Sequence, residues 1–375
     1  MNKTMIIRFL LFFIVTLTVI FFAHLFIYKA HIKFIEIENI KIKRVLILVY
    51  IGMFSLLFFS MFAVRFWNNA FTDNLYYIST LWLGILTYLF IFIVLNWIVF
   101  TGFKLLNINF NFKYLHLFFL FLTIVVSILG TINYYKIKDT VITVELKNLP
   151  SSWEKKKVIF ISDIHLGNFR EQQFITKFVE KINKKNPDII IIGGDLFDGT
   201  ILNVDKISAE LGKLHANEKI FFVYGNHDNY SKPEDVKKIL KNVNFTILDN
   251  ASIIQDSVDI IGINHNSLHN DSVFAALKEE GIRTRPVIFI SHEPVKKTEN
   301  LENLGIDLQL SGHTHGGQFF PFTLITKAIY GKMNYGLHDF GKFQSFTSSG
   351  LGAWGPAFRL FSKSEIVEIK FKSIK

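Results

Sequence analysis

The chain has 375 residues, half of them hydrophobic, and a formal net charge of +10 at pH 7. It contains no cysteine, so disulfides, thiolate metal ligands and a cysteine nucleophile are excluded. Residues 1–150 carry 13 Lys/Arg against 5 Asp/Glu, a balance of +8, whereas residues 151–375 carry 28 against 26, a balance of +2. An enzyme acting on nucleic acid concentrates positive charge on its soluble part, so this distribution does not support polyanion binding.

Four long uncharged runs in the first 150 residues predict membrane-spanning helices. They are Phe9–Ile27, Val45–Val64, Leu75–Phe100 and Tyr114–Tyr135. Each has the ~20 residues that a helix needs to cross a hydrocarbon layer of ~30 Å. We therefore expect an all-α transmembrane bundle over residues 1–138, a linker over 139–156 and a second domain over 157–375.

Four spans place both ends of the bundle on the same side of the membrane. Basic residues outside the spans divide seven against six, or nine with three distant lysines, so their number does not fix the orientation. The first span alone favours a cytoplasmic connector 29–44, which places the C-terminal domain outside the cytoplasm. The polar residues His24, Asn96 and His116 lie near the ends of the runs, so we expect an anchor rather than a pore or carrier.

Five short apolar runs in the second half each lead into residues that can bind metals. The runs are Val158–Ile161, Asp188–Ile192, Ile220–Tyr224, Val287–Ile290 and Ile306–Leu310. Their β-branched composition predicts buried strands, and the helical spacing of residues 170–185 predicts an α/β domain. Ligands of such sheets gather at the carboxyl ends of the strands. We therefore expect the polar ends of the five runs to converge on one edge.

Taken singly, each polar motif has a structural alternative. Asp163 could be a turn aspartate, Asn226 could cap a helix, and His292 could be a hydrogen-bonded core histidine. Five repeats of one positional pattern favour a shared metal site over five separate structural roles. His265, in a polar loop outside the pattern, is expected to play no part in that site.

The chain resembles the calcineurin-like metallophosphoesterases in five successive motifs. These are Asp163-x-His165, Gly194-Asp195-x-x-Asp198, Gly225-Asn226-His227-Asp228, His292 and Gly312-His313-x-His315. Three further stretches are similar to the bacterial membrane-associated subgroup, namely Leu308–Gln318, Gly350–Arg359 and Glu365–Val367. Some members of that subgroup hydrolyse UDP-2,3-diacylglucosamine. The resemblance implies a four-layer α/β/β/α sandwich, a multi-pass protein of the bacterial cell membrane and a role in lipid metabolism.

The resemblance also implies two divalent metal ions, with Mn, Fe or Zn favoured. One ion would be held by Asp163, His165, Asp195 and His315. The other would be held by Asp195, Asn226, His292 and His313, with Asp195 bridging. Neutral Asn and His ligands limit the negative charge, so an anionic phosphate can approach a cluster that stays positive. A hydroxide bridging the two metals would then attack phosphorus in line.

Two further residues are expected to serve the reaction. His227 would act as the acid at the leaving oxygen or as a cationic stabiliser of the transition state. Asp198 would orient the His227 ring. Arg359 would either meet substrate oxygens or form a structural salt bridge.

These observations predict a membrane-anchored phosphohydrolase with a phosphorylated small-molecule or lipid substrate. We favour a lipid-linked or glycolipid phosphoester or diphosphate, because membrane lipid lies beside an anchored site. Only 63 residues (229–291) separate the third motif from His292, so we expect no inserted lipid-binding cap, which counts against UDP-diacylglucosamine.

Two alternatives stay open. The first is a nucleotide or nucleic-acid phosphodiesterase, although nucleic acid is not an expected partner. The second is a non-catalytic metal-binding membrane scaffold, which would be expected to lack a ligand.

Overall fold

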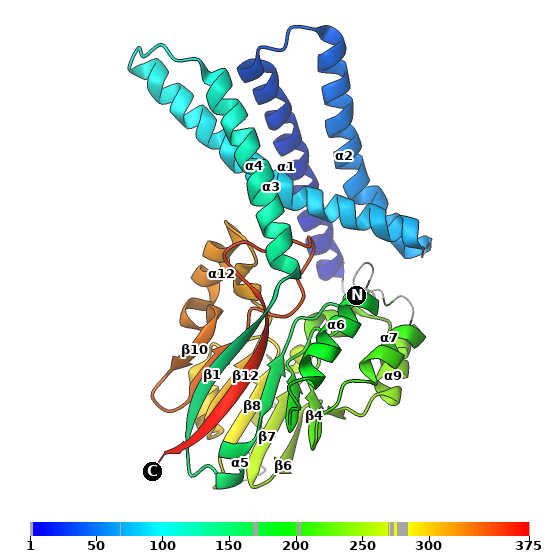
Figure 1. Ribbon diagram of the computed structural model, residues 1–375, viewed down its shortest axis with the longest axis vertical. Helices are drawn as coiled ribbons and strands as arrows, with labels where there is room; N and C mark the ends of the chain where they lie inside the picture. The colour runs from blue at the N-terminus through cyan, green and yellow to red at the C-terminus, as the bar shows by residue number, and fades with distance from the viewer. Residues whose placement is uncertain are drawn as a thin grey trace. The chain divides into compact units, whose positions relative to one another are not determined.

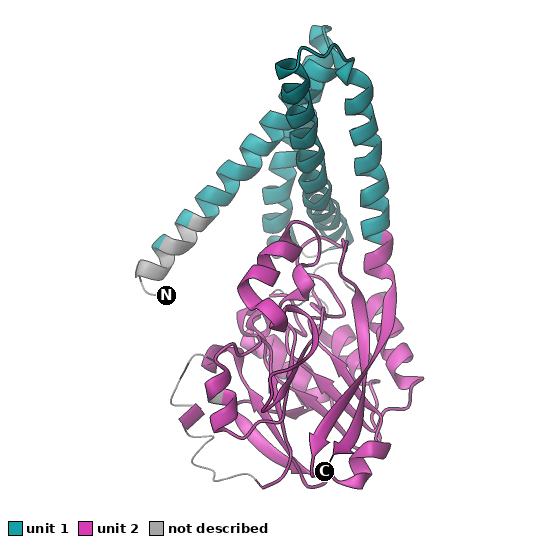
Figure 2. Cartoon of the chain, turned by 90° about the vertical axis from the view of Figure 1, so that its left-hand side faces the viewer, with its two compact units in different colours: residues 1–131 teal, residues 132–375 magenta. Residues whose placement is uncertain are grey.

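The computed structural model describes residues 3–67, 69–167, 172–199, 201, 204–268, 270, 274–275 and 284–374 (Figure 1). The chain forms two compact units, Met1–Thr131 and Ile132–Lys375 (Figure 2). The first unit is helical, and the second is a mixed α/β domain with two sheets. This arrangement confirms the fold class that the sequence predicts.

Four long helices make up the first unit. They are α1 (Lys3–Ile35), α2 (Ile40–Phe66), α3 (Ala70–Leu105) and α4 (Phe112–Tyr135). All four are long and apolar enough to cross a membrane, as the uncharged runs predict. Asn residues in the connectors start two of them. Asn39 Oδ1 accepts a hydrogen bond from the Lys41 N–H, and Asn69 forms a capping box with Thr72.

The interior of the first unit is more polar than the sequence suggests. Although His24, Asn96 and His116 lie near the ends of their runs, all three side chains are buried. His31 Nδ1 lies 2.8 Å from His116 Nε2, and His31 Nε2 lies 2.7 Å from Tyr50 Oη. Asn96 Nδ2 lies 3.3 Å from His116 Nδ1. One hydrogen-bonded network thus joins α1, α2, α3 and α4, because polar groups within an apolar bundle are stable when they bind one another.

The second unit contains two six-stranded sheets. The first has the order β1 (Ile137–Lys147), β12 (Ser364–Ile374), β2 (Val158–Ile161), β3 (Ile189–Ile192), β4 (Lys219–Phe222) and β5 (Thr246–Ile247). The second has the order β10 (Gly336–Asp339), β11 (Gln344–Thr347), β9 (Leu308–Ser311), β8 (Val287–Ser291), β7 (Val258–Ile263) and β6 (Ala251–Gln255). Strands β2, β3 and β4 run parallel, as do β7, β8 and β9. Their apolar runs are buried on both faces, as is typical of parallel strands.

Helices cover the outer faces of both sheets. The second unit contains ten helical segments among the described residues, not all of which lie on those faces. They are α5 (Ser151–Lys155), α6 (Gln172–Asn183), α7 (Val204–Leu211), α8 (Asn226–Tyr230), α9 (Pro233–Asn242), η1 (His265–Ser267), α11 (Thr298–Asn303), η2 (His315–Gly317), α12 (Phe322–Tyr330) and η3 (Gly331–Asn334). Phe178 of α6 and Ile239 of α9 pack on the first sheet, and Leu301 of α11 packs on the second. A third core lies between the sheets and includes Phe160 and Leu310. The layers are therefore helix, sheet, sheet, helix.

Residues 139–156, which the sequence predicts to be a linker, instead belong to the folded domain. Half of them lie in β1, which pairs in parallel with β12 from Ile137↔Ser364 to Lys147↔Ile374. The short helix α5 follows, and its Trp153 is fully buried. Because β1 lies at the edge of the sheet, many of its residues are polar and exposed, and this hides the strand in the sequence.

Between the third motif and His292, the described residues form ordinary parts of the domain. They include α9, β5, β6, β7 and η1. Residues 269, 271–273 and 276–283 lie outside the described residues. The expectation that this stretch has no inserted cap therefore stays a prediction.

The last turn of α4 belongs to the second unit, which begins at Ile132 (Figure 2). The Asn133 side chain donates hydrogen bonds to the carbonyls of Arg359 and Ser362, at 3.2 Å and 2.8 Å. Only Lys136 separates α4 from β1. The fourth long helix therefore continues directly into the edge strand of the first sheet.

Candidate metal centre

The five sequence motifs all follow strands in the structure. In the first sheet they follow β2, β3 and β4, and in the second they follow β8 and β9. The side chains concerned are Asp163, His165, Asp195, Asp198, Asn226, His227, His292, His313 and His315. The sequence predicts one sheet edge, whereas the structure divides the motifs between two packed sheets. The distances below show that the side chains still meet at one place.

The backbone at this site is unusual for residues with side chains. The φ angle is positive at Asp163 (53°), His165 (52°), Asp195 (52°), His313 (69°) and His315 (52°). Each such residue costs of order 1–3 kcal/mol and persists only where the surrounding structure holds it. The chain therefore leaves β2, β3 and β9 through strained turns, which concentrate at functional sites.

One group of possible metal ligands consists of Asp163, His165 and His315. Their ligand atoms all lie within 4.8 Å of one another. His165 Nε2 lies 3.1 Å from His315 Nε2, which in turn lies 3.4 Å from Asp163 Oδ1. The backbone N–H of His313 donates to the Asp163 carboxylate at 3.0 Å and fixes its position. All three ligand side chains are buried.

A second group consists of Asp195, His292 and His313. His292 Nε2 lies 3.0 Å from Asp195 Oδ2 and 3.3 Å from His313 Nδ1. Asn226 Oδ1 lies 3.1 Å from the same Nδ1 atom. Asp195 Oδ2 also lies 3.7 Å from His165 Nε2. Asp195 thus lies between the two groups, in the place that a bridging carboxylate requires.

His227 and Asp198 form a pair beside these groups. His227 Nδ1 lies 2.8 Å from Asp198 Oδ1, and the His227 ring is 4.7 Å from the His165 ring. Burial lowers the pKa of His227, but its hydrogen bond to Asp198 and the charges of Asp195 and Asp198 raise the pKa above its ordinary value. Asp198 therefore holds the ring in one orientation and favours its protonated form.

The electrostatics of the site suit a bound cation. Burial lowers the pKa of His292, but the carboxylates of Asp195 and Asp163 outweigh it and raise the pKa to about 10. Burial and the charge of His292 lower the pKa of His313 to about 3, and burial holds the pKa of His315 well below its usual value. The two buried carboxylates thus favour a proton on His292, whereas the rings of His313 and His315 favour the neutral form. Divalent ions bound by this nitrogen and oxygen set would displace that proton.

Asp228 has a positioning role that the sequence does not reveal. Its Oδ2 accepts hydrogen bonds from the Asp195 and Gly225 N–H groups at 2.8 Å, and its Oδ1 accepts one from the Phe197 N–H at 2.9 Å. This buried carboxylate therefore joins the ligand turns that follow β3 and β4. Burial and the neighbouring Asp195 charge raise the pKa of Asp228 to about 7.

Two glycines let the carboxylates approach the backbone. A Cβ at Gly225 would lie 2.1 Å from Asp195 Oδ1, and a Cβ at Gly312 would lie 2.3 Å from Asp163 Oδ2. Both distances are far below van der Waals contact. These positions need glycine because a ligand carboxylate occupies the space of a side chain.

Arg359 and His265 both lie close to the candidate ligands. Arg359 is fully buried, and its guanidinium donates to the carbonyl of Ser349 at 2.7 Å and lies 3.3 Å from His315 Nδ1. Its buried guanidinium therefore supports the turn that carries His315. The sequence predicts no role for His265, yet its ring lies 5.7 Å from the His313 ring and 6.1 Å from the His292 ring. Its loop carries no repeated pattern, so no sequence signal reveals this placement.

Known proteins share these motifs. Residues 156–317 match the family described as Calcineurin-like phosphoesterase. An uncharacterized metallophosphoesterase of Campylobacter jejuni is 33% identical over 253 residues, which cover 64% of this chain and 67% of that protein. One of Helicobacter pylori is 31% identical over 239 residues, covering 63% of each chain.

A vertebrate relative is also similar. The Danio rerio protein named as a transmembrane protein with a metallophosphoesterase domain is 29% identical over 271 residues, covering 67% of this chain and 61% of that protein. The chain thus spans 61% to 67% of the length of these three relatives, whose names specify no substrate. With the family motifs in order and their side chains together, the chain belongs to the calcineurin-like metallophosphoesterases.

Proposed function

We propose that this protein is a membrane-anchored, metal-dependent phosphohydrolase that cleaves a phosphoester or diphosphate bond. The observation that carries the proposal is the convergence of two carboxylates, one amide and four imidazoles from five strand ends. We assign one ion to Asp163, His165, Asp195 and His315, and the other to Asp195, Asn226, His292 and His313. Two divalent cations and two carboxylates leave a net positive site, which suits an anionic phosphate.

The residues of the chain have separate tasks in this reaction. When bound, two divalent ions of Mn, Fe or Zn would polarise the phosphoryl group and lower the pKa of an attacking water. His227 Nδ1 is hydrogen-bonded to Asp198, so the proton on Nε2 of the same ring is free for transfer to the leaving oxygen. Asp228 and Arg359 hold the ligand turns and touch no reacting atom.

We propose a lipid-linked or glycolipid phosphoester or diphosphate as the substrate class. The four membrane-crossing helices support this choice, because they confine the site beside a bilayer. The near-neutral balance of residues 151–375 counts against nucleic acid. A UDP-2,3-diacylglucosamine type of substrate belongs to the proposed class only if the domain faces the cytoplasm.

The test is an assay of the full chain in lipid vesicles after reconstitution with Mn, Fe or Zn. The panel comprises lipid phosphates, UDP-diacylglucosamine, an aryl phosphodiester and DNA. We expect metal-dependent release of phosphate or phosphomonoester from a lipid substrate. Turnover of DNA alone would favour the phosphodiesterase alternative, and no turnover by the metal-loaded chain would contradict the proposal.

Two variants separate metal binding from proton transfer. Asp195→Asn should lose bound metal and activity together, because it removes the shared carboxylate. His227→Asn should keep its metal and lose ~10²–10⁴-fold in turnover. His215→Asn is the matched control, since His215 is exposed in the loop that follows α7. Wild-type turnover by His227→Asn on a substrate with a poor leaving group would show that His227 is not the acid.

We propose that the catalytic domain lies outside the cytoplasm, because the first span favours a cytoplasmic connector 29–44. A reporter that is active only outside the cytoplasm, fused at the C-terminus, should be active in cells. An active cytoplasmic reporter at the same position would reverse the orientation.

A further inference from the structure

Helix α12 exposes its apolar side and turns its polar side inwards. The exposed residues occupy one continuous arc and are Phe322 (41% exposed), Leu324 (58%), Ile325 (50%) and Ile329 (52%), with Ala328 between them. The half-buried residues on the opposite arc are Thr323, Thr326 and Tyr330. A helix on the surface of a soluble protein has the reverse arrangement. Exposed apolar patches of this kind mark an interaction site.

The exposed apolar surface extends to the loop that precedes β12. Trp354 is 59% exposed and Phe361 is 77% exposed. The Gln318 side chain, four residues before α12, donates to the carbonyls of Trp354 and Pro356 at 3.0 Å and 3.1 Å. The backbone carbonyl of Gln318 accepts a hydrogen bond from Ser362 Oγ at 2.8 Å. The loop and the start of α12 are therefore held together. We call the six large residues Phe322, Leu324, Ile325, Ile329, Trp354 and Phe361 the apolar face.

The same loop is fastened to the end of a membrane-crossing helix. As described above, the Asn133 side chain binds the carbonyls of Arg359 and Ser362. Ser364 Oγ also donates to the carbonyl of Tyr134, at 2.9 Å. These residues of the last turn of α4 belong to the same compact unit as the loop and α12. Because α4 crosses the membrane, the bilayer surface lies within a few residues of Tyr135.

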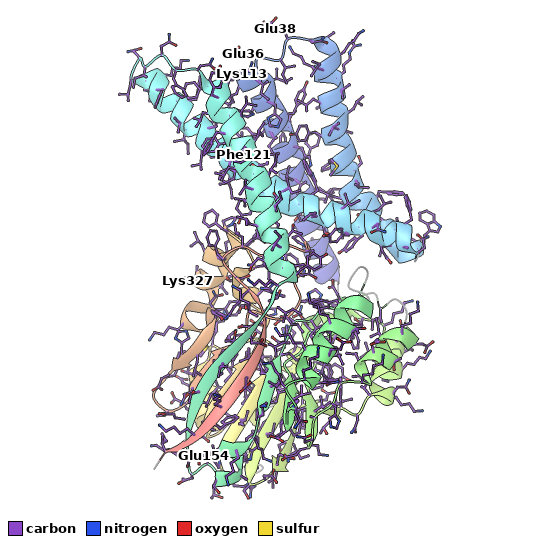
Figure 3. The ribbon with its side chains drawn as sticks, viewed as in Figure 1. Glu36, Glu38, Lys113, Phe121, Glu154 and Lys327 are labelled. Atoms are coloured by element: carbon purple, nitrogen blue, oxygen red, sulfur yellow. The ribbon has the colours of Figure 1, made fainter. Side chains whose placement is uncertain are left out.

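We propose that the apolar face inserts into the lipid bilayer beside the end of α4. The residue types around it suit a membrane interface, where Trp and Lys are enriched. Trp354 belongs to the face, and Lys327 is exposed on α12 (Figure 3). Lys332, just after the helix, is exposed as well. Burial of the apolar arc in the outer part of the bilayer, with lysines near the headgroups, is the binding mode of interfacial helices. The inference rests on the membrane-crossing helices and not on the proposed phosphohydrolase activity.

The apolar face leads to the candidate metal centre. Tyr330, the last residue of α12, donates from its hydroxyl to Glu293 Oε1 at 2.9 Å. Its ring lies 6.2 Å from the ring of His313. A helix that is embedded in lipid on one side therefore ends beside a metal-ligand residue. A substrate with an acyl chain could reach the centre without leaving the membrane.

The absence of cysteine makes a direct test simple. Ile325→Cys and Phe361→Cys in the full chain each provide one site for a bimane fluorophore. The labelled proteins are reconstituted into phosphatidylcholine and phosphatidylglycerol vesicles, with or without brominated acyl chains. We expect both labels to lose most of their fluorescence in the brominated vesicles, because bromine quenches only within the lipid.

Ile254→Cys is the matched control. Ile254 lies on β6 and is 56% exposed. The carbonyl of its neighbour Gln255 accepts a hydrogen bond from Trp153 Nε1, and Trp153 follows β1 in the chain. The eleven residues of β1 place its far end about 35 Å from the membrane end of the domain. The label at residue 254 should not be quenched. Equal, weak quenching at residues 254, 325 and 361 would overturn the proposal.

A second copy of the chain is the other possible occupant of the apolar face. Nitroxide labels at residues 325 and 361 distinguish the two cases. If the face inserts into the bilayer, the nitroxides should be relaxed by lipid-soluble agents. At low protein density they should show no dipolar coupling between copies of the chain. Dipolar coupling between copies, together with protection from lipid-borne quenchers, would show a dimer interface and overturn the membrane assignment.

Discussion

At the scale of single residues, the candidate site depends on groups that hold the ligands as well as on the ligands. Asp228 accepts three backbone hydrogen bonds, and Arg359 supports the turn that carries His315. Neither residue touches substrate in the proposed reaction. Loss of such a supporting group typically costs about 10–100-fold in metal affinity.

We expect Asp228→Asn to weaken metal binding by ~10–100-fold, because an amide nitrogen would face one of the three backbone N–H groups. Titration of the metal-free chain with Mn or Zn measures this change. Asp205→Asn is the control, since Asp205 is an exposed residue of α7 that pairs with Lys238. Unchanged metal affinity in Asp228→Asn would show that the two ligand turns hold their positions without it.

The sequence is sufficient to group the candidate ligands, but it does not reveal the residues that hold their turns in place. Asp163, Asn226 and His292 each follow an apolar run, so strand ends and side-chain chemistry were sufficient to group them. The role of Asp228 depends on which backbone N–H groups it meets, and that is fixed by the turns after β3 and β4. His265 approaches His313 through a loop without periodicity. The ligand assignments themselves stay a prediction until metal binding is measured.

At the scale of elements, Glu365 joins parts of the domain that are distant in sequence. This buried carboxylate accepts from Ser348 Oγ and the Ser349 N–H at 3.0 Å and from Thr140 Oγ1 at 2.6 Å, and Lys363 Nζ lies 3.2 Å away. Burial raises the pKa of Glu365, but these hydrogen bonds and Lys363 lower it below the ordinary value. The charged form therefore stabilises the junction of β1, β12 and the loop after β11.

We expect Glu365→Gln to lower the free energy of unfolding by about 2 kcal/mol near pH 7. Because the folded pKa is depressed, the stabilisation is present above the unfolded pKa near 4.5 and is lost as pH falls through the folded pKa. Apparent unfolding temperatures of the full chain in detergent, measured from pH 7 to pH 3, test this. Glu368→Gln, on β12, is the control. If the difference in unfolding temperature between wild type and Glu365→Gln is as large at pH 3 as at pH 7, the charged form of Glu365 is not what stabilises the junction.

The network of His31, Tyr50, Asn96 and His116 belongs to the helices of the first unit. We expect His31→Leu to lower the apparent unfolding temperature, because Tyr50 Oη and His116 Nε2 lose a partner inside an apolar bundle. Hydrogen bonds between membrane helices contribute about 0.6 kcal/mol on average, so a small shift is expected. Thr18→Leu is the control, because the exposed Thr18 hydroxyl donates to the Ile14 carbonyl within α1. Equal unfolding temperatures for the two variants would show that the network adds no stability.

Sequence periodicity has a clear limit at the scale of elements. It predicts the long apolar helices well, because a membrane span needs length and composition alone. It does not predict β1, whose edge position mixes polar with apolar residues. It also cannot show that the apolar arc of α12 faces outwards, since the same pattern usually covers a core.

At the scale of the whole molecule, the catalytic domain begins with the last turn of α4. A fragment that starts at Ile132 retains β1, whereas one that starts at Lys157 exposes the edge of the eleven-residue strand β12. Long exposed edges pair with other chains. We expect the 157–375 fragment to aggregate and the 132–375 fragment to stay monodisperse in the same mild detergent, as measured by size-exclusion chromatography. Monodisperse behaviour of both fragments would show that β1 is dispensable.

The pairing of β1 with β12 also sets an order of events during synthesis. Residues 137–147 leave the ribosome early, but their partner strand consists of residues 364–374. Contacts between such distant segments form late and slowly. The first sheet therefore cannot close until residues 364–374 have been made, by which time the four apolar helices have already left the ribosome. A premature stop just before β12 would leave the apolar helices complete and the first sheet with an open edge.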